Sequence, residues 1–166
     1  MLDLSCWHKL CGPASAEFAL MDEKAEPIDG PAKRGDHLRI DIPGPGTATC
    51  GGYDWVRVEF IEEISNPAKD EESCGMKVRA ACAPGEEQKD TAHFFKSDAT
   101  SSFIVHRSQK KVTASYHGRN EIPNTSTGNT ADNIRNTMVA MGAIAGFSEV
   151  QWSTLAKGFL KNEIRQ

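Results

Sequence analysis

Hydrophobic and polar residues alternate along the middle of the chain, and such alternation is typical of β-strands with one buried face. Three runs predict strands over residues 37–42, 54–61 and 76–82. Pro43 is expected to end the first strand, because proline lacks the backbone donor that a strand ladder needs. The inward positions of the three strands are Leu38, Ile40, Ile42, Val56, Val58, Phe60, Met76, Val78, Ala80 and Cys82. Between them, the acidic segment 62–75 is expected to be an exposed loop.

Residues 103–117 predict a β-hairpin whose turn is centred on Gln109 and Lys110. With that centre, the cross-strand pairs are Phe103–Tyr116, Val105–Ala114 and Arg107–Val112. A slip by one residue would place the apolar residues of the two strands on opposite faces, so the pattern favours a loop of even length. Gln-Lys lacks the Gly or Asn that two-residue turns usually contain, and a four-residue loop is the alternative.

The N-terminal segment, residues 1–36, predicts no complete arrangement. Residues 14–20 alternate loosely, which fits either a strand or a short helix after Pro13. Residues 25–36 contain two Pro and two Gly, and this composition predicts a loop.

The C-terminal part changes to helical periodicity. Thr130 can cap a helix from Ala131 to about Ala145, with Gly146 at the position where helices often stop. The buried stripe of this helix is expected to contain Ile134, Met138, Met141 and Ala145. Ser148 and Gln151 have the spacing of a capping box, which predicts a second helix to about Asn162. Its expected buried stripe contains Trp152, Leu155, Ala156 and Phe159.

The order of strands first and helices afterwards is typical of the α+β class. We expect a mostly antiparallel sheet or partly open barrel of about five or six strands, with the C-terminal helical pair packed on it. The chain is short enough for a single domain over residues 1–166. Within it, we expect an uncertain N-terminal segment (1–36), a β region (37–117) and a helical pair (130–162).

Composition narrows the class of protein. The net charge of −4 argues against nucleic acid as the partner, because nucleic-acid binders usually carry a basic face. Neither a signal peptide nor an apolar run long enough to span a membrane is recognisable, so no membrane association is expected. The five cysteines are odd in number and widely spread, which fits reduced thiols. We therefore expect a cytoplasmic protein.

The densest group of functional side chains is His117-Gly118-Arg119-Asn120-Glu121, which follows the predicted hairpin. His117 and Glu121 are candidates for catalytic base and acid, while Arg119, Asn120 and Tyr116 are candidates for ligand binding. The alternative is that Gly118 forms a turn and that the charged residues only hydrate the loop. The segment matches no known catalytic signature.

Metal sites and cofactors are not expected. If Ser102 lies opposite His117, His106 lies roughly 13 Å further along, too far to share one zinc ion. His93 is the third histidine of this region. Cys6, His8 and Cys11 lie close together in the sequence, but the second pair of ligands that structural zinc sites need is missing. Whether these three residues have a chemical role is left open.

No complete catalytic constellation is visible, and this points to a non-catalytic module that binds a protein partner or itself. The helical pair has more apolar residues than one stripe requires, so part of it is expected to meet another subunit. These residues are Met138, Val139, Met141, Ile144 and Phe147. The alternative is a small-molecule enzyme or ligand-binding protein that uses the 117–121 loop in a pocket between sheet and helices.

Overall fold

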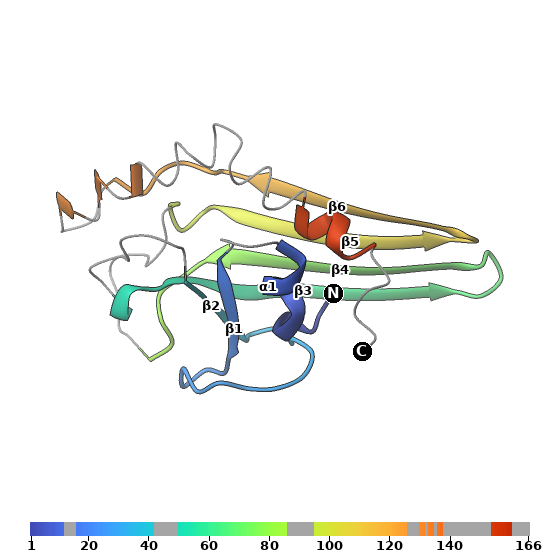
Figure 1. Ribbon diagram of the computed structural model, residues 1–166, viewed down its shortest axis with the longest axis horizontal. Helices are drawn as coiled ribbons and strands as arrows, with labels where there is room; N and C mark the ends of the chain where they lie inside the picture. Colours follow the sequence, from blue (N-terminus) through green and yellow to red (C-terminus); the bar gives the residue numbers. More distant parts are fainter. Residues whose placement is uncertain are drawn as a thin grey trace.

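The computed structural model describes residues 1–11, 16–41, 50–85, 95–125, 130–131, 133–134, 136–137 and 154–160. An antiparallel sheet of six strands forms its centre, with the strands side by side in sequence order (Figure 1). The strands are β1 (Glu17–Met21), β2 (His37–Asp41), β3 (Asp54–Asn66), β4 (Glu71–Ala80), β5 (Thr100–Ser108) and β6 (Lys111–Arg119). The predicted antiparallel α+β architecture is thereby confirmed. A short 3-10 helix, η2 (Cys50–Gly52), precedes β3.

The β3–β4 hairpin is longer than the sequence predicted. β3 continues to Asn66 and β4 begins at Glu71, so that only residues 67–70 form the turn. The prediction of a loop over 62–75 was therefore wrong. Acidic composition suggested exposure, but exposed side chains on a sheet do not prevent backbone pairing, and β5 pairs with β4 along this whole stretch. Both long hairpins extend past β1 and β2 (Figure 1).

A β-bulge corrects the predicted direction of one aromatic residue. Val58 pairs with Val78, but the next paired residue is Phe60, opposite Lys77. The extra residue, Glu59, shifts the alternation, so Phe60 lies outward and Ile61 packs against the core instead. β4 also ends at Ala80, and Cys82 therefore follows the strand rather than forming its last inward position.

The β5–β6 hairpin has the predicted register. Phe103 pairs with Tyr116, Val105 with Ala114 and Arg107 with Val112. Ser108 and Lys111 form the last pair, so the two-residue alternative for the loop is correct. Gln109 takes a φ of 54° there, a left-handed conformation that glycine or asparagine usually supplies.

The N-terminal segment contains elements that the sequence did not reveal. A 3-10 helix, η1 (Leu4–Cys6), leads directly into the short helix α1 (Trp7–Cys11). The Asp3 carboxylate accepts a hydrogen bond from the Ser5 backbone nitrogen at 3.0 Å and so caps this turn. Of the two predictions for residues 14–20, the strand is confirmed over Glu17–Met21.

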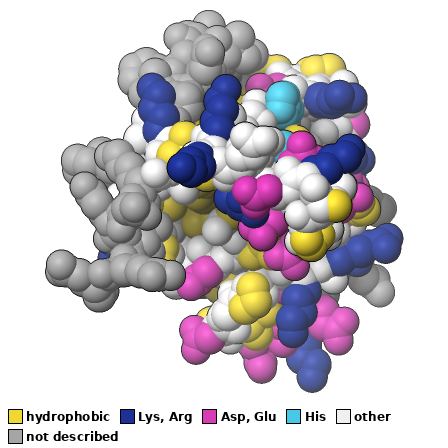
Figure 2. All heavy atoms as spheres, turned by 90° about the vertical axis from the view of Figure 1, so that its right-hand side faces the viewer, with side chains coloured by type: hydrophobic (Ala, Val, Ile, Leu, Met, Phe, Trp, Pro, Cys, Tyr) yellow, Lys and Arg dark blue, Asp and Glu magenta, His cyan; other side chains and the backbone are white. Residues whose placement is uncertain are grey.

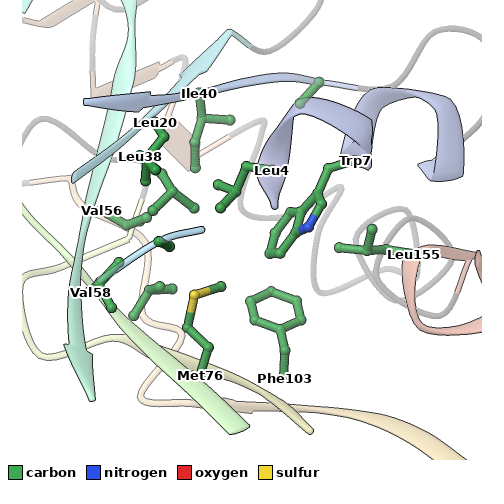
Figure 3. Packing of buried hydrophobic residues seen from close by; sticks show 13 residues of the cluster. Leu4, Trp7, Leu20, Leu38, Ile40, Val56, Val58, Met76, Phe103 and Leu155 are labelled. Carbon is green, nitrogen blue, oxygen red and sulfur yellow. The ribbon is translucent and has the colours of Figure 1, made fainter. Parts of the chain in front are cut away.

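The core lies between this N-terminal segment and one face of the sheet, here called the inner face (Figure 3). Trp7 is its centre, with its ring packed edge-on against the rings of Phe18, Phe103 and Phe159 at centroid distances of 5.4, 5.1 and 5.7 Å. The Trp7 indole nitrogen donates to the Met1 carbonyl at 2.9 Å, so its only polar atom is satisfied. The buried cluster also contains Leu4, Leu20, Leu38, Ile40, Val56, Val58, Met76, Val78 and Leu155.

The predicted C-terminal helical pair is not confirmed as a unit. The described residues between 130 and 137 are helical, but Ile134, predicted to be buried, is 58% exposed. Asn136 is buried instead, and its side-chain nitrogen donates to the Asn124 carbonyl at 2.8 Å. This hydrogen bond explains why a polar residue takes the inner position. Met138, Met141, Ala145, Gly146, Ser148, Gln151 and Trp152 lie outside the described residues.

The second predicted helix is present over its described part, residues 154–158. Leu155 and Ala156 are buried and Phe159 packs against the core, as the predicted stripe required. The segment lies against α1, because a Cβ added at Gly158 would be only 2.7 Å from the Leu10 Cβ.

Candidate interaction surface

The opposite face of the sheet, here called the outer face, carries exposed apolar residues on the two long hairpins. Cross-strand pairs point to the same face, so the register places Phe60, Ile64, Gly75 and Ile104 together on it. The side chains of Phe60 and Ile64 are each 50% exposed and that of Ile104 is 39% exposed. We call these four residues the outer patch. α1 and the helix at 154–158 both pack on the inner face, so neither covers this patch.

Gly75 lies in the middle of the outer patch, where it contributes no side chain to the surface. It pairs with Glu62 on one side and with Ile104 on the other. A Cβ added at Gly75 would meet no atom nearer than the Phe103 carbonyl oxygen at 4.0 Å. The site therefore has room for a side chain, and Ile104 stands beside a position that has none.

Charges on the outer face differ between its two halves. On β3 and β4, Glu59 forms ion pairs with Arg79 and with Lys77, the latter at 3.0 Å. The hydrogen bond from Arg79 is the main reason that the pKa of Glu59 lies below its usual range. Further along this half, the outward residues Glu62 and Glu71 are acidic.

The outward residues of β6 are basic or neutral, since register places Lys111, His117 and Arg119 on that face. The outer face thus carries charges of both signs on β3 and β4, where Lys77 and Arg79 also lie, whereas the charged outward residues of β6 are all basic. Figure 2 views the hairpin tips end-on and shows acidic and basic side chains gathered around them.

At the tips, Arg107 joins the two hairpins. Its Nη1 donates to Asp70 Oδ1 at 2.7 Å and to the Gln109 carbonyl at 2.9 Å, while its Nη2 lies 3.3 Å from Glu72 Oε1. The Gln109 backbone nitrogen also donates to the Asp70 carbonyl at 2.8 Å. These contacts hold β3–β4 and β5–β6 in one continuous surface.

The predicted functional loop at the end of β6 is split between the two faces. His117 is exposed on the outer face, where its Nε2 lies 3.1 Å from the Ser115 hydroxyl. Tyr116 points to the inner face, and its hydroxyl donates to Glu121 Oε1 at 2.7 Å. Burial is the main reason that the pKa of Tyr116 is raised.

The structure therefore does not bring His117 and Glu121 together on one face. Arg119 and Asn120 are exposed, and the Asn120 side-chain nitrogen donates to the Asp98 carbonyl at 3.3 Å. None of the three cavities identified among the described residues is lined by a residue of 117–121. The catalytic and ligand-binding roles of these residues remain predictions.

The register of the last hairpin separates His106 from His117 along the sheet. Ser102 pairs with His117 and Thr113 with His106, the register on which the argument against a shared metal rested. Among the described residues, no group of three or more His, Cys, Asp or Glu side chains is placed to hold a metal ion. Cys6 is a free thiol, whereas His93 and the side chain of Cys11 lie outside what the structure describes.

Sequence reasoning missed the outer patch. Phe60 was predicted to face inward, Gly75 belonged to the segment predicted as a loop, and Ile104 takes the outward position between the inward residues Phe103 and Val105. Their arrangement depends on the bulge and on the register between β4 and β5. The apolar residues predicted for an interface, Met138, Val139, Met141, Ile144 and Phe147, lie outside the described residues.

Comparison with known proteins identifies no relative: no protein-family profile, no curated protein and no solved structure matches the chain significantly. In the described part, no helix combines the length and apolar character needed to cross a membrane. Any functional conclusion must therefore come from the chain's own surface.

Proposed function

We propose that this protein is a non-catalytic, self-associating module, in which the outer faces of two copies pack against each other. The observation that supports the proposal is the exposed Ile104 beside Gly75, with the exposed Phe60 and Ile64 on the same face. Exposed apolar patches with a charged surround commonly mark interaction sites.

A two-fold axis parallel to the strands and midway between β4 and β5 gives the expected geometry. Rotation about that axis lays β4 of one copy over β5 of the other. Ile104 of each copy then meets Gly75 of the second copy, and both contacts form at once, as an isologous interface requires. Packed sheets lie about 10 Å apart, a distance at which facing side chains interdigitate.

The same rotation decides which other residues of the two copies face each other. It lays β3 of one copy over β6 of the other, so that Phe60 faces His117 and Asn66 faces Lys111, with Glu71 on the neighbouring strand. The outer face is thus complementary to itself in shape at Ile104 and Gly75.

The test is sedimentation equilibrium of the full chain over a wide concentration range. We expect a reversible dimer. The variant Gly75→Val should be the most informative, because the added side chain has room within the monomer but occupies the position that Ile104 of the second copy needs. We expect it to shift the chain to monomer, while its unfolding midpoint, compared at a concentration where the wild type is also monomeric, stays the same or rises.

Ile104→Lys should also give monomer, because it buries a charge in the apolar contact. Val112→Lys is the matched control, since Val112 is 45% exposed but points to the inner face. A wild-type chain that stays monomeric at high concentration would contradict the proposal, as would a Gly75→Val variant that dimerises normally.

A further inference from the structure

The largest described cavity is a cleft of about 640 Å³ at the other end of the sheet. It lies between β2, β3, the loop that follows β1 and residues 81–85. Its size is in the range of pockets that hold small molecules. Three basic side chains from different segments line it: Arg34, His37 and Arg57.

His37 and Arg57 are held beside each other by the sheet. They are a cross-strand pair of β2 and β3, and their side chains point to the outer face. Arg34 belongs to the loop before β2, which is fixed by two backbone hydrogen bonds between this loop and Val58: Gly35 nitrogen to Val58 oxygen at 2.9 Å and Val58 nitrogen to Asp36 oxygen at 2.8 Å.

Asp22 and Asp36, two of the three carboxylates that line the cleft, have backbone partners. Asp22 Oδ1 accepts from the backbone nitrogens of Lys24 and Glu26 at 2.8 and 2.9 Å. Asp36 Oδ2 accepts from the Lys33 nitrogen at 2.8 Å. Within the described part of the chain, neither Arg34 nor Arg57 forms an ion pair with a carboxylate. The two guanidinium groups thus line the cleft unpaired among the described residues, although Asp22, Glu23 and Asp36 contribute negative charge to the same lining.

Packing and backbone hydrogen bonds hold the residues beneath the cleft in place. Beside it, Trp55 and Met21 form a small buried cluster on the outer face, against which Ala83 packs. The Ala81 nitrogen donates to the Trp55 carbonyl at 3.0 Å and ties the 81–85 segment to β3. His37 Nδ1 is buried and has no hydrogen-bond partner among the described residues.

From this arrangement we infer that the cleft binds a small oxyanion, a phosphate or carboxylate group held by Arg57 and Arg34 with His37 beside it. Guanidinium groups bind such oxygens through paired, charge-assisted hydrogen bonds. The inference does not depend on self-association, because the cleft and the outer patch have no residue in common.

The state of His37 supplies a second readout. Burial first, and then the nearby Arg57, lower the pKa of His37, while Asp36 opposes this effect. The other charged groups around the cleft are Asp22, Glu23 and Arg34. A bound anion favours the protonated imidazole, so by linkage the pKa of His37 must rise when the cleft is occupied.

The experiment is an NMR titration of the full chain with inorganic phosphate, and separately with acetate, at constant ionic strength. Saturable shifts of the His37 ring and of the residues around it are expected for at least one anion, and comparison of the two titrations shows which oxyanion is preferred. The titration midpoint of His37 should move to higher pH in the presence of that anion.

Arg57→Gln and Arg34→Gln should each weaken binding about tenfold or more, because each removes a charge-assisted pair. Arg119→Gln is the matched control, since Arg119 is equally charged but lies outside the cleft. The unfolding midpoint of each variant without anion shows whether it is folded. The inference would be overturned if neither anion binds saturably, or if all three variants lose the same amount of affinity.

Discussion

Trp7 and Phe103 meet edge to face, with their ring centroids 5.1 Å apart and an angle of 64° between their planes. One residue comes from a five-residue helix near the N-terminus and the other from β5. The contact thus joins the least predictable part of the sequence to the most predictable one. Leu155, from the C-terminal part, is buried in the same cluster.

Trp7→Ala should be the most destabilising single change in the N-terminal segment. Removal of a buried tryptophan typically costs about 3–5 kcal/mol of unfolding free energy. Urea unfolding of the variant measures the loss, and Trp7→Phe, which keeps an aromatic ring, should lose less. A loss below about 1 kcal/mol would show that α1 contributes little to the core.

Gly158→Ala tests how closely the helix at 154–158 packs on α1. Alanine is normally about 1 kcal/mol better than glycine within a helix. Here the new methyl group would lie 2.7 Å from the Leu10 Cβ, so we expect a net destabilisation of about 1–3 kcal/mol. The exposed neighbour provides the control, because Lys157→Ala should change stability by less than about 0.5 kcal/mol.

Glu59→Gln should remove part of the dependence of stability on pH. The pKa of Glu59 is lowered in the folded state, chiefly by the hydrogen bond from Arg79. Its contribution is therefore fully present above the unfolded pKa and is lost as the pH falls through the folded one. Unfolding free energies of the wild type and the variant should converge in acid and diverge near neutral pH.

Glu62→Gln is the control for that comparison, since Glu62 is an exposed glutamate on the same strand. It should change the unfolding free energy less than Glu59→Gln does, because it removes no ion pair within the described part of the chain. Equal profiles for wild type and Glu59→Gln would show that the ion pairs with Arg79 and Lys77 contribute nothing to stability.

Gln109→Gly should stabilise the protein. Gln109 adopts a φ of 54°, where a residue with a side chain pays about 1–2 kcal/mol and glycine does not. The greater flexibility of glycine in the unfolded chain offsets part of the gain, so we expect a net increase of about 0.5–1 kcal/mol. Lys110→Gly relieves no positive φ, because Lys110 does not have one, and it should therefore be neutral or destabilising. Thermal unfolding of the two variants distinguishes these outcomes.

Much of the sheet could be predicted from sequence because the relevant signals are local. Alternation identified the strands at 37–42, 54–61 and 76–82. The β5–β6 register followed from the requirement that Phe103 and Tyr116 share a face, and these two rings lie 5.4 Å apart. A wrong register would have exposed half of the apolar residues, so one solution was strongly favoured.

Other features could not be predicted, because they depend on contacts between distant segments. The extra residue of the β-bulge, Glu59, forms ion pairs with Arg79 and Lys77, and the bulge turns Phe60 outward. The acidic composition of residues 62–75 predicted a loop, although backbone pairing extends β3 and β4 through this segment. Asn136 is buried, and Ile134 is not, because the Asn124 carbonyl accepts a hydrogen bond from the Asn136 side chain.

The sequence by itself determined the strand periodicity, the antiparallel α+β class and the pairing of the last hairpin, since each depends on the order of neighbouring side chains. The tertiary structure alone decided that Trp7 is central, that Ile104 stands beside Gly75 on the outer face, and that Arg34, His37 and Arg57 share a cleft. These relationships arise where strands and loops far apart in the chain come together, and no local pattern of residues encodes those distances.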